Sequence, residues 1–194
     1  MAFNNSFTAV TGATYTAAQY NTHVRDNFTA IWVYTTAGDI AYATSSTTLA
    51  RLGIGANGYY LESNGSAPTW QQFVRVAGFQ LNTDVALGTG EKVKWRVPSA
   101  LNGHNLIGVA ASRASGTGVP SLQYKRNRSG STVNMLSTAL TIDSGEIDSS
   151  TAATPAVINT SNDDVATADQ LIIEVTAAGT STLFCFAEFR FAKP

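Results

Sequence analysis

Apolar residues recur with helical spacing near the beginning of the chain. The stripe is formed by Tyr20, Val24, Phe28 and Ile31. A spacing of four, four and three residues predicts a helix over residues 17–31. Thr16 followed three positions later by Gln19 fits a capping box at the start of this helix. No second amphipathic helix follows, so the stripe is expected to pack on a β domain, on copies of itself or on another protein.

Residues 73–194 instead show short apolar segments separated by Gly, Asn, Ser and Pro turns. The predicted strands are 73–81, 92–97, 105–112, 121–126, 132–136, 140–143, 170–176 and 182–191. Many short strands without an intervening helix predict an antiparallel β-sandwich or jelly roll.

The last predicted strand has two distinct faces, because side chains alternate along a strand. One face carries Leu183, Cys185, Ala187, Phe189 and Phe191. The other carries Phe184, Phe186, Glu188 and Arg190. Both faces are largely apolar, which predicts a strand that is central in its sheet or covered by a neighbouring subunit.

Three parts follow from these patterns: an N-terminal helical segment (1–32), an irregular β module (33–72) and a β-sandwich domain (73–194). The middle part is too rich in glycine and turn residues to bury a core of its own, so it is expected to gain order by oligomerisation. The predicted oligomerisation residues are Tyr20, Val24, Phe28, Ile31, Leu49, Leu52 and Trp70. The predicted fold class is therefore mainly β, with a short N-terminal helix and a C-terminal sandwich.

Composition narrows the function classes. Charged residues make up 13% of the 194 residues, the net charge is −1 and the pI is about 6.1. With so small a net charge, the protein has no overall electrostatic attraction for nucleic acid or for a membrane surface. No apolar run is long enough to span a bilayer. The N-terminus lacks the basic and apolar regions of a signal peptide. We therefore expect no nucleic-acid partner, no membrane insertion and no export signal.

The charges are segregated along the sandwich domain. The basic residues between positions 92 and 142 are Lys92, Lys94, Arg96, Arg113, Lys125, Arg126 and Arg128, with no acidic residue among them. The acidic residues between 143 and 189 are Asp143, Glu146, Asp148, Asp163, Asp164, Asp169, Glu174 and Glu188, with no basic one. Cross-strand pairing within one sandwich is the simplest interpretation. Complementary charge across a subunit interface and a basic patch for an anionic ligand are the alternatives.

Candidate catalytic residues are sparse. His23 and His104 are far apart in sequence, and Cys185 among phenylalanines is expected to be a buried, inert thiol. Asp143, Glu146 and Asp148 could in principle serve glycoside hydrolysis, although carboxylates in a polar turn are usually solvated. The same cluster, or Asn162, Asp163 and Asp164, could bind Ca²⁺, although the EF-hand spacing is absent. We predict neither an enzyme nor a cofactor.

One stretch resembles a known module. The segments Gly38-Asp39-Ile40-Ala41-Tyr42-Ala43, Leu49-Ala50-Arg51-Leu52-Gly53, Gly58-Tyr59-Tyr60-Leu61 and Ala67-Pro68-Thr69-Trp70 are similar to a module of tailed-bacteriophage tail fibres and related virion proteins. Residues 15–27 resemble the lead-in helix of such proteins, and residues 138–164 resemble a β domain found on phage structural proteins. Tyr59 and Tyr60 depart from the usual small or β-branched residues of the module.

The resemblance implies a virion component that is typically homotrimeric, attached to other virion proteins through its N-terminal region and assembled in the host cytoplasm. A tail-tip or tail-fibre protein would bind a host-surface glycan or protein through many weak, non-catalytic contacts. The predicted contacts are Arg113, Lys125, Arg126 and Arg128. The alternative is a structural virion protein, such as a head fibre, capsid decoration or collar/baseplate adaptor, which the short length favours.

Overall fold

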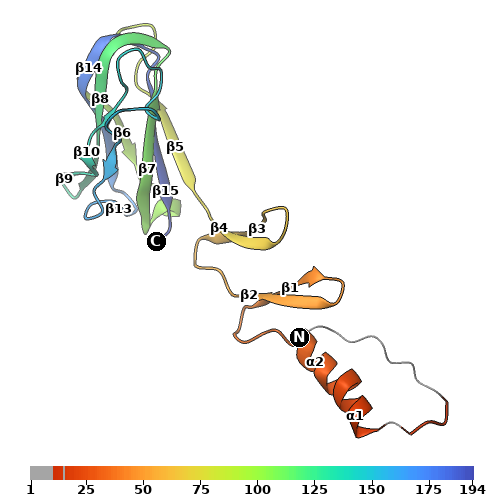
Figure 1. The fold of residues 1–194 in the computed structure, drawn as a ribbon. Coiled ribbons are helices and arrows are strands. Elements are labelled where there is room, and N and C mark those ends of the chain that lie inside the picture. The colour runs from red at the N-terminus through yellow and green to blue at the C-terminus, as the bar shows by residue number, and fades with distance from the viewer. Residues whose placement is uncertain (1–10, 15) are drawn as a thin grey trace. The chain divides into compact units, whose positions relative to one another are not determined.

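The computed structural model describes residues 11–14 and 16–194, and it divides into two compact units, Met1–Gln72 and Phe73–Pro194 (Figure 1). The boundary lies where the sequence predicts the β-sandwich domain to begin. The fold is mainly β with antiparallel sheets and helical structure near the N-terminus, which confirms the predicted fold class. In the part of the chain that the structure describes, no helix is long and apolar enough to cross a membrane.

The unit Phe73–Pro194, called here the sandwich unit, contains two main antiparallel sheets. The first has the order β11 (Leu140–Thr141), β8 (Ser115–Arg128), β14 (Gln170–Leu183) and β6 (Gly90–Arg96), with β9 (Ser131–Asn134) also paired to β8. The second has the order β13 (Asp164–Val165), β7 (His104–Ser112), β15 (Phe186–Ala192) and β5 (Arg75–Gln80). A small pair is formed by β10 (Leu136–Thr138) and β12 (Val157–Ile158), and a 3₁₀ turn covers Ser99–Leu101.

Aromatic contacts join the inner faces of the two sheets. The ring centroids of Tyr124 on β8 and Phe189 on β15 lie 4.8 Å apart in an edge-to-face arrangement. Between the edge strands β5 and β6, the ring centroids of Phe79 and Trp95 are 5.6 Å apart. The buried Tyr124 hydroxyl donates to the carbonyl of Ala110 at 3.1 Å, so its polar end is satisfied. The two sheets therefore form the predicted sandwich.

Strand β15 is central, between β7 and β5, as its two apolar faces predict. Its inner residues Ala187, Phe189 and Phe191 are fully buried, as is Cys185 just before it. The prediction placed the start of this strand too early, at position 182. Residues with φ near 50° at Ser181 and Phe184 turn the chain there, so β14 ends at Leu183 and β15 begins at Phe186. Burial raises the pKa of the Cys185 thiol to about 11, in keeping with an inert thiol.

In the N-terminal unit, α1 (Ala17–Tyr20), a π-helical turn (Asn21–Arg25) and α2 (Asp26–Ile31) follow one another, and their combined bounds match the predicted helix. The capping box is present: Thr16 Oγ1 accepts from the Gln19 amide at 3.2 Å and the Gln19 side chain accepts from the Thr16 amide at 2.9 Å. The π turn was not predicted. Its hydrogen bonds span five residues, as from the Asp26 amide to the Asn21 carbonyl, which shifts the phase of the apolar stripe.

Two hairpins complete this unit: β1 (Ile40–Ser45) with β2 (Thr48–Leu52), and β3 (Tyr59–Ser63) with β4 (Pro68–Gln72). Among its described residues, Ala30 alone is a buried hydrophobic residue. Large apolar side chains are exposed instead: Tyr20, Phe28, Ile31, Trp32, Tyr34, Ile54, Tyr59, Tyr60 and Leu61. Helix α2 does contact β2, but the unit has no hydrophobic core of its own comparable to that of the sandwich unit.

The structure corrects the prediction that Arg113 is a surface contact. Arg113 is 3% exposed, and its guanidinium donates to the carbonyls of Glu146 (2.9 Å), Gly118 (3.2 Å) and Asp143 (2.9 Å). Asp143 and Glu146 belong to the loop that follows β11, about 30 positions further along the chain, whereas Gly118 lies on β8, five positions after the arginine. Arg113 therefore ties this loop to the start of β8.

Substitution Arg113→Met should destabilise the sandwich unit by about 3 kcal/mol or more, because it removes three hydrogen bonds from a charged donor, each worth roughly 1.5–3 kcal/mol. Urea unfolding of residues 73–194, followed by Trp95 fluorescence, measures the change. Lys92→Met, which replaces an exposed lysine of β6, is the matched control and should change stability by less than about 0.5 kcal/mol. Equal effects of the two substitutions would contradict a structural role for Arg113.

Candidate functional site

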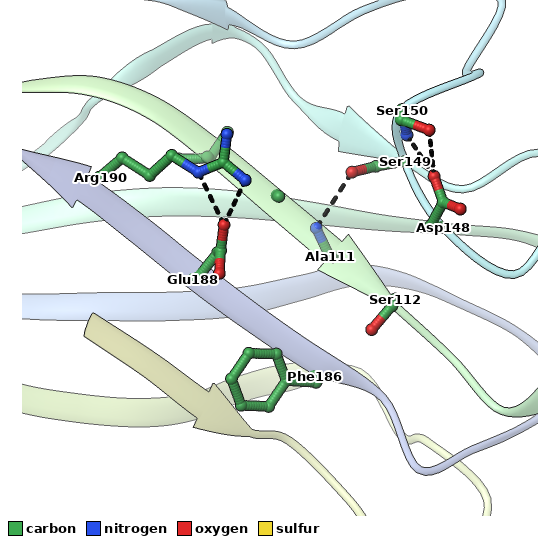
Figure 2. A pocket seen from close by; sticks show the side chains of 10 residues that line it. Ala111, Ser112, Asp148, Ser149, Ser150, Phe186, Glu188 and Arg190 are labelled. Atoms are coloured by element: carbon green, nitrogen blue, oxygen red, sulfur yellow. Dashed lines mark hydrogen bonds and ion pairs between the residues drawn. The ribbon is translucent and has the colours of Figure 1, made fainter. Parts of the chain in front are cut away.

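A hollow of about 370 Å³ lies on the face of the second sheet that points away from the core (Figure 2). We call it the β7–β15 hollow. It is lined by residues 109–112 of β7, residues 148–150 of the loop between β11 and β12, and Phe186, Glu188 and Arg190 of β15. Its volume is near the lower end of the range for small-molecule sites.

Phe186 provides an open aromatic surface at one side of the hollow. Its ring lies over β5 at Gly78, where a Cβ atom would come within 2.3 Å of the ring atom Cζ. The side chain nevertheless remains 40% exposed. Only glycine at position 78 allows the ring to lie down on the neighbouring strand in this way, which keeps it available to a ligand.

Glu188 and Arg190 form an ion pair next to this ring. The Arg190 Nε and Nη2 atoms both contact Glu188 Oε1, at 2.7 and 2.5 Å (Figure 2). The arginine stem extends over Gly108 of β7, where a Cβ atom would lie 3.5 Å from Arg190 Cδ. The residues paired with Glu188 on the neighbouring strands are Gly78 and Ala110, so no large side chain lies directly opposite Glu188 in the sheet.

The opposite side of the hollow is formed by a loop that is attached to the end of β7. An isolated bridge pairs Ser112 with Asp148, and the Ala111 amide donates to Ser149 Oγ at 3.0 Å. The Ser150 amide donates to Asp148 Oδ1 at 2.7 Å, and the Ser150 hydroxyl donates to the same atom. These Ser150 bonds lower the pKa of Asp148 and keep it a carboxylate.

The hollow thus offers an aromatic surface surrounded by both donors and acceptors. Among the residues that the structure describes, Glu188 Oε2, Asp148 Oδ2, Arg190 Nη1 and the Ser112 hydroxyl have no hydrogen-bond partner. A glycoside hydrolase would need one carboxylic acid with a raised pKa. Asp148, whose pKa is lowered, does not meet this requirement, and Glu188 is held in an ion pair with Arg190.

The other candidate carboxylates have structural partners. Asp143 Oδ2 accepts from the Ala153 amide at 2.8 Å, and Glu146 accepts from the Thr151 hydroxyl. Within residues 11–14 and 16–194, no three His, Cys, Asp or Glu side chains gather in a way that could hold a metal ion. The suggested Ca²⁺ ligands near Asp143 and Asp163 are therefore not brought together.

The remaining predicted contact residues lie on β8, outside the hollow, and pair with the acidic half of the chain. Lys125 Nζ lies 2.5 Å from Glu174 Oε2. Arg128 donates from Nε to Asp169 Oδ1 at 2.9 Å and from Nη2 to Asp169 Oδ2 at 2.7 Å. Arg126 is 8% exposed and pairs with Asp164. Burial alone would raise the pKa of Asp164, but the hydrogen bonds from Arg126 and Arg128 outweigh it, so the pKa is lowered. Cross-strand pairing, the simplest interpretation of the segregated charges, is confirmed for these three cations.

The basic stripe of β6 differs, since Lys92, Lys94 and Arg96 are exposed. Lys94 pairs locally with Glu91 at 2.6 Å. Because β6 lies at the edge of its sheet, these charges also disfavour pairing with the edge of another chain.

The predicted oligomerisation residues have two kinds of environment. Tyr20, Phe28 and Ile31 are 52%, 67% and 43% exposed, whereas Val24, Leu49, Leu52 and Trp70 are half-buried. The Trp70 indole N–H donates to the Gly53 carbonyl at 2.7 Å, and its ring covers Gly55, where a Cβ atom would lie 2.5 Å from Trp70 Cδ2. Trp70 therefore has a role within the chain in addition to any role between chains.

Asp39 organises the turn before β1. Its carboxylate accepts from the Thr35 and Thr36 amides, both at 2.8 Å, and pairs with Arg51 of β2 at 3.2 Å. The Thr35 amide contributes most to lowering the pKa of Asp39 to about 2. The Asp, Arg and Trp positions of the phage-like segments are thus the ones that connect the turn and the two hairpins.

No protein-family model and no curated protein matches the sequence. Among solved structures, the structure of infectious bursal disease virus, Gx strain, is similar to this chain with a TM-score of 0.30 and 10% sequence identity, over 77% of this chain and 40% of that chain. The present chain thus spans less than half of the length of that viral chain. A TM-score this low identifies neither a shared fold nor a shared function.

Asp39 should titrate with a midpoint near 2, below its ordinary value of 3.8, when followed by NMR with labelled aspartate. Because its pKa is depressed in the folded chain, its contribution to stability is present above pH 3.8 and is lost as the pH falls through about 2. Asp39→Asn should increase amide exchange at Thr35 and Thr36 at neutral pH. Asp26→Asn, which removes only a surface contact with Arg25, is the control. A midpoint near 3.8 would contradict the assigned contacts.

Proposed function

We propose that this chain is a bacteriophage virion protein of the tail tip or tail fibre, which binds the host surface through multivalent, non-catalytic contacts. The observation that carries the proposal is the contrast between the two units. The sandwich unit has a complete core and a hollow with unpaired polar groups, whereas the described part of the N-terminal unit exposes its large apolar side chains.

Self-association explains this contrast most simply. Exposed apolar side chains on small modules are typical of surfaces that are buried in an assembly. Three copies could bury Phe28, Ile31 and their exposed neighbours around a common axis, in agreement with the trimeric state that the resemblance implies. Each copy would then present one sandwich unit, so weak binding at single sites would add up to firm attachment.

The phage-like segments support the same proposal. Asp39, Arg51 and Trp70 pin the turn and the hairpins by hydrogen bonds rather than by a hydrophobic core. Such a module keeps a defined backbone while its apolar side chains remain available to neighbouring copies or to other virion proteins. A head fibre, capsid decoration or adaptor would use the same module, and the location of the chain on the particle separates these roles from host attachment.

The full chain should form a trimer in light scattering, and residues 73–194 should be monomeric. The double substitution Phe28→Ser/Ile31→Ser should shift the full chain toward the monomer, because it removes two exposed apolar side chains of the proposed interface. Val85→Ser, at a residue of the sandwich unit that is 72% exposed, should leave the trimer unchanged. A monomeric full chain would remove the basis for avidity.

Purified full chain, added to host cells before the virus, should slow adsorption of the particle by competing for its attachment sites. Residues 73–194 should compete less well, since a single sandwich unit lacks avidity. Full chain that binds cells and blocks adsorption would support attachment. Full chain that leaves adsorption unchanged would favour the structural virion role instead.

A further inference from the structure

We propose that the β7–β15 hollow binds a neutral sugar, a hexose or N-acetylhexosamine residue of a surface polysaccharide. The inference rests on the proposed function, since it names the ligand class of the host-binding sandwich unit. Three features of the hollow carry it: an aromatic surface, a mixed set of hydrogen-bonding groups and its local charge.

The aromatic surface matches one side of a pyranose ring. That side carries C–H groups, which pack on the electron-rich face of an aromatic ring. Phe186 is 40% exposed and its ring lies on the backbone at Gly78, so the ring is already positioned before a ligand arrives. The ring therefore loses little conformational freedom when a ligand binds.

The polar groups match the edge of a sugar. A hydroxyl group both donates and accepts, so a site that offers carboxylates together with a guanidinium and hydroxyls can satisfy several of them at once. The hollow supplies Asp148 and Glu188 as acceptors, Arg190 as a donor and Ser112 as either (Figure 2). The Glu188–Arg190 pair and the Ser150 bonds to Asp148 hold these groups in place.

The charge of the hollow selects against acidic sugars. It contains two carboxylates, Asp148 and Glu188, and one cation, Arg190. The guanidinium is already paired with Glu188, so a ligand carboxylate would meet one uncompensated negative charge. A neutral sugar avoids this repulsion, whereas sialic acid or a uronic acid does not.

The test measures binding of methyl glucoside, methyl galactoside, methyl mannoside and N-acetylglucosamine to the full chain by saturation-transfer NMR and calorimetry, with glucuronic acid and N-acetylneuraminic acid as acidic counterparts. At least one neutral sugar should bind, and the acidic sugars should bind at least tenfold more weakly. Phe186→Ala should weaken binding of the neutral sugar at least tenfold. Phe184→Ala removes a similarly exposed phenylalanine outside the hollow and should leave binding unchanged.

Gly78→Ala is the second variant, because it displaces the Phe186 ring without removing it. Gly78 has no left-handed backbone conformation, so alanine fits the strand, and Trp95 fluorescence of residues 73–194 carrying the same substitution shows whether the sandwich unit remains folded. Gly78→Ala should weaken binding of the sugar in the same direction as Phe186→Ala. The absence of binding by any neutral sugar, or equal binding by wild type and Phe186→Ala, would overturn the proposal.

Adsorption assays separate this inference from the proposed function. If the full chain blocks viral adsorption but Phe186→Ala blocks it equally well, host attachment stands and the sugar site is wrong. If Phe186→Ala loses competition while no neutral sugar binds, the hollow contacts the host through another kind of ligand and the sugar class is wrong. If a neutral sugar binds and Phe186→Ala weakens that binding, but neither protein affects adsorption, the sugar site stands and host attachment is wrong.

Discussion

The burial of one face of β15 is the constraint on which the rest of the sandwich unit depends. Ala187, Phe189 and Phe191 are fully buried between β7 and β5 and against Tyr124 of the opposite sheet. Because side chains alternate, a slip of one residue would expose all of them, so the register is fixed by the hydrophobic effect. The same register puts Phe186, Glu188 and Arg190 on the outer face. These three side chains of the candidate site are therefore positioned by the core that lies beneath β15.

The N-terminal unit is different, because Ala30 is the one buried hydrophobic residue among those that the structure describes there. Its order depends on directional contacts: the Asp39 carboxylate on two amides, the Arg51 guanidinium on Asp39, and the Trp70 indole on the Gly53 carbonyl. Hydrogen bonds contribute modest net stability but define geometry well. Such a unit can therefore have a precise backbone and still need partners for its hydrophobic side chains, which is the combination that an assembly module requires.

Periodicity and capping in the sequence were sufficient for the helix bounds, the mainly β fold and the two faces of β15. Features that depend on distant contacts were not accessible in this way. Arg113 resembled a surface cation because nothing local shows that its guanidinium contacts the carbonyls of Asp143 and Glu146, about 30 positions further along the chain. The strands β12 and β13 have two residues each and so carry no period. Asp148 reaches the hollow through its bridge to Ser112, 36 positions earlier in the chain. The outer face of β15 itself could be predicted, because side chains alternate along the strand.

The chemistry of the β7–β15 hollow and the architecture of the chain support the same kind of function. The hollow keeps Arg190 paired with Glu188 and holds Asp148 as a carboxylate, an arrangement that fits the reversible binding proposed above. A site of this kind gains few contacts per copy, so its affinity for a single ligand is limited. Attachment to a surface that displays many identical sugars changes this limit, because the second and third binding events become intramolecular. In the proposed assembly a weak site would be an advantage, because copies would release and rebind singly while the particle stays attached. The exposed apolar surface of the N-terminal unit would join those copies, so that one proposal accounts for both units of the chain.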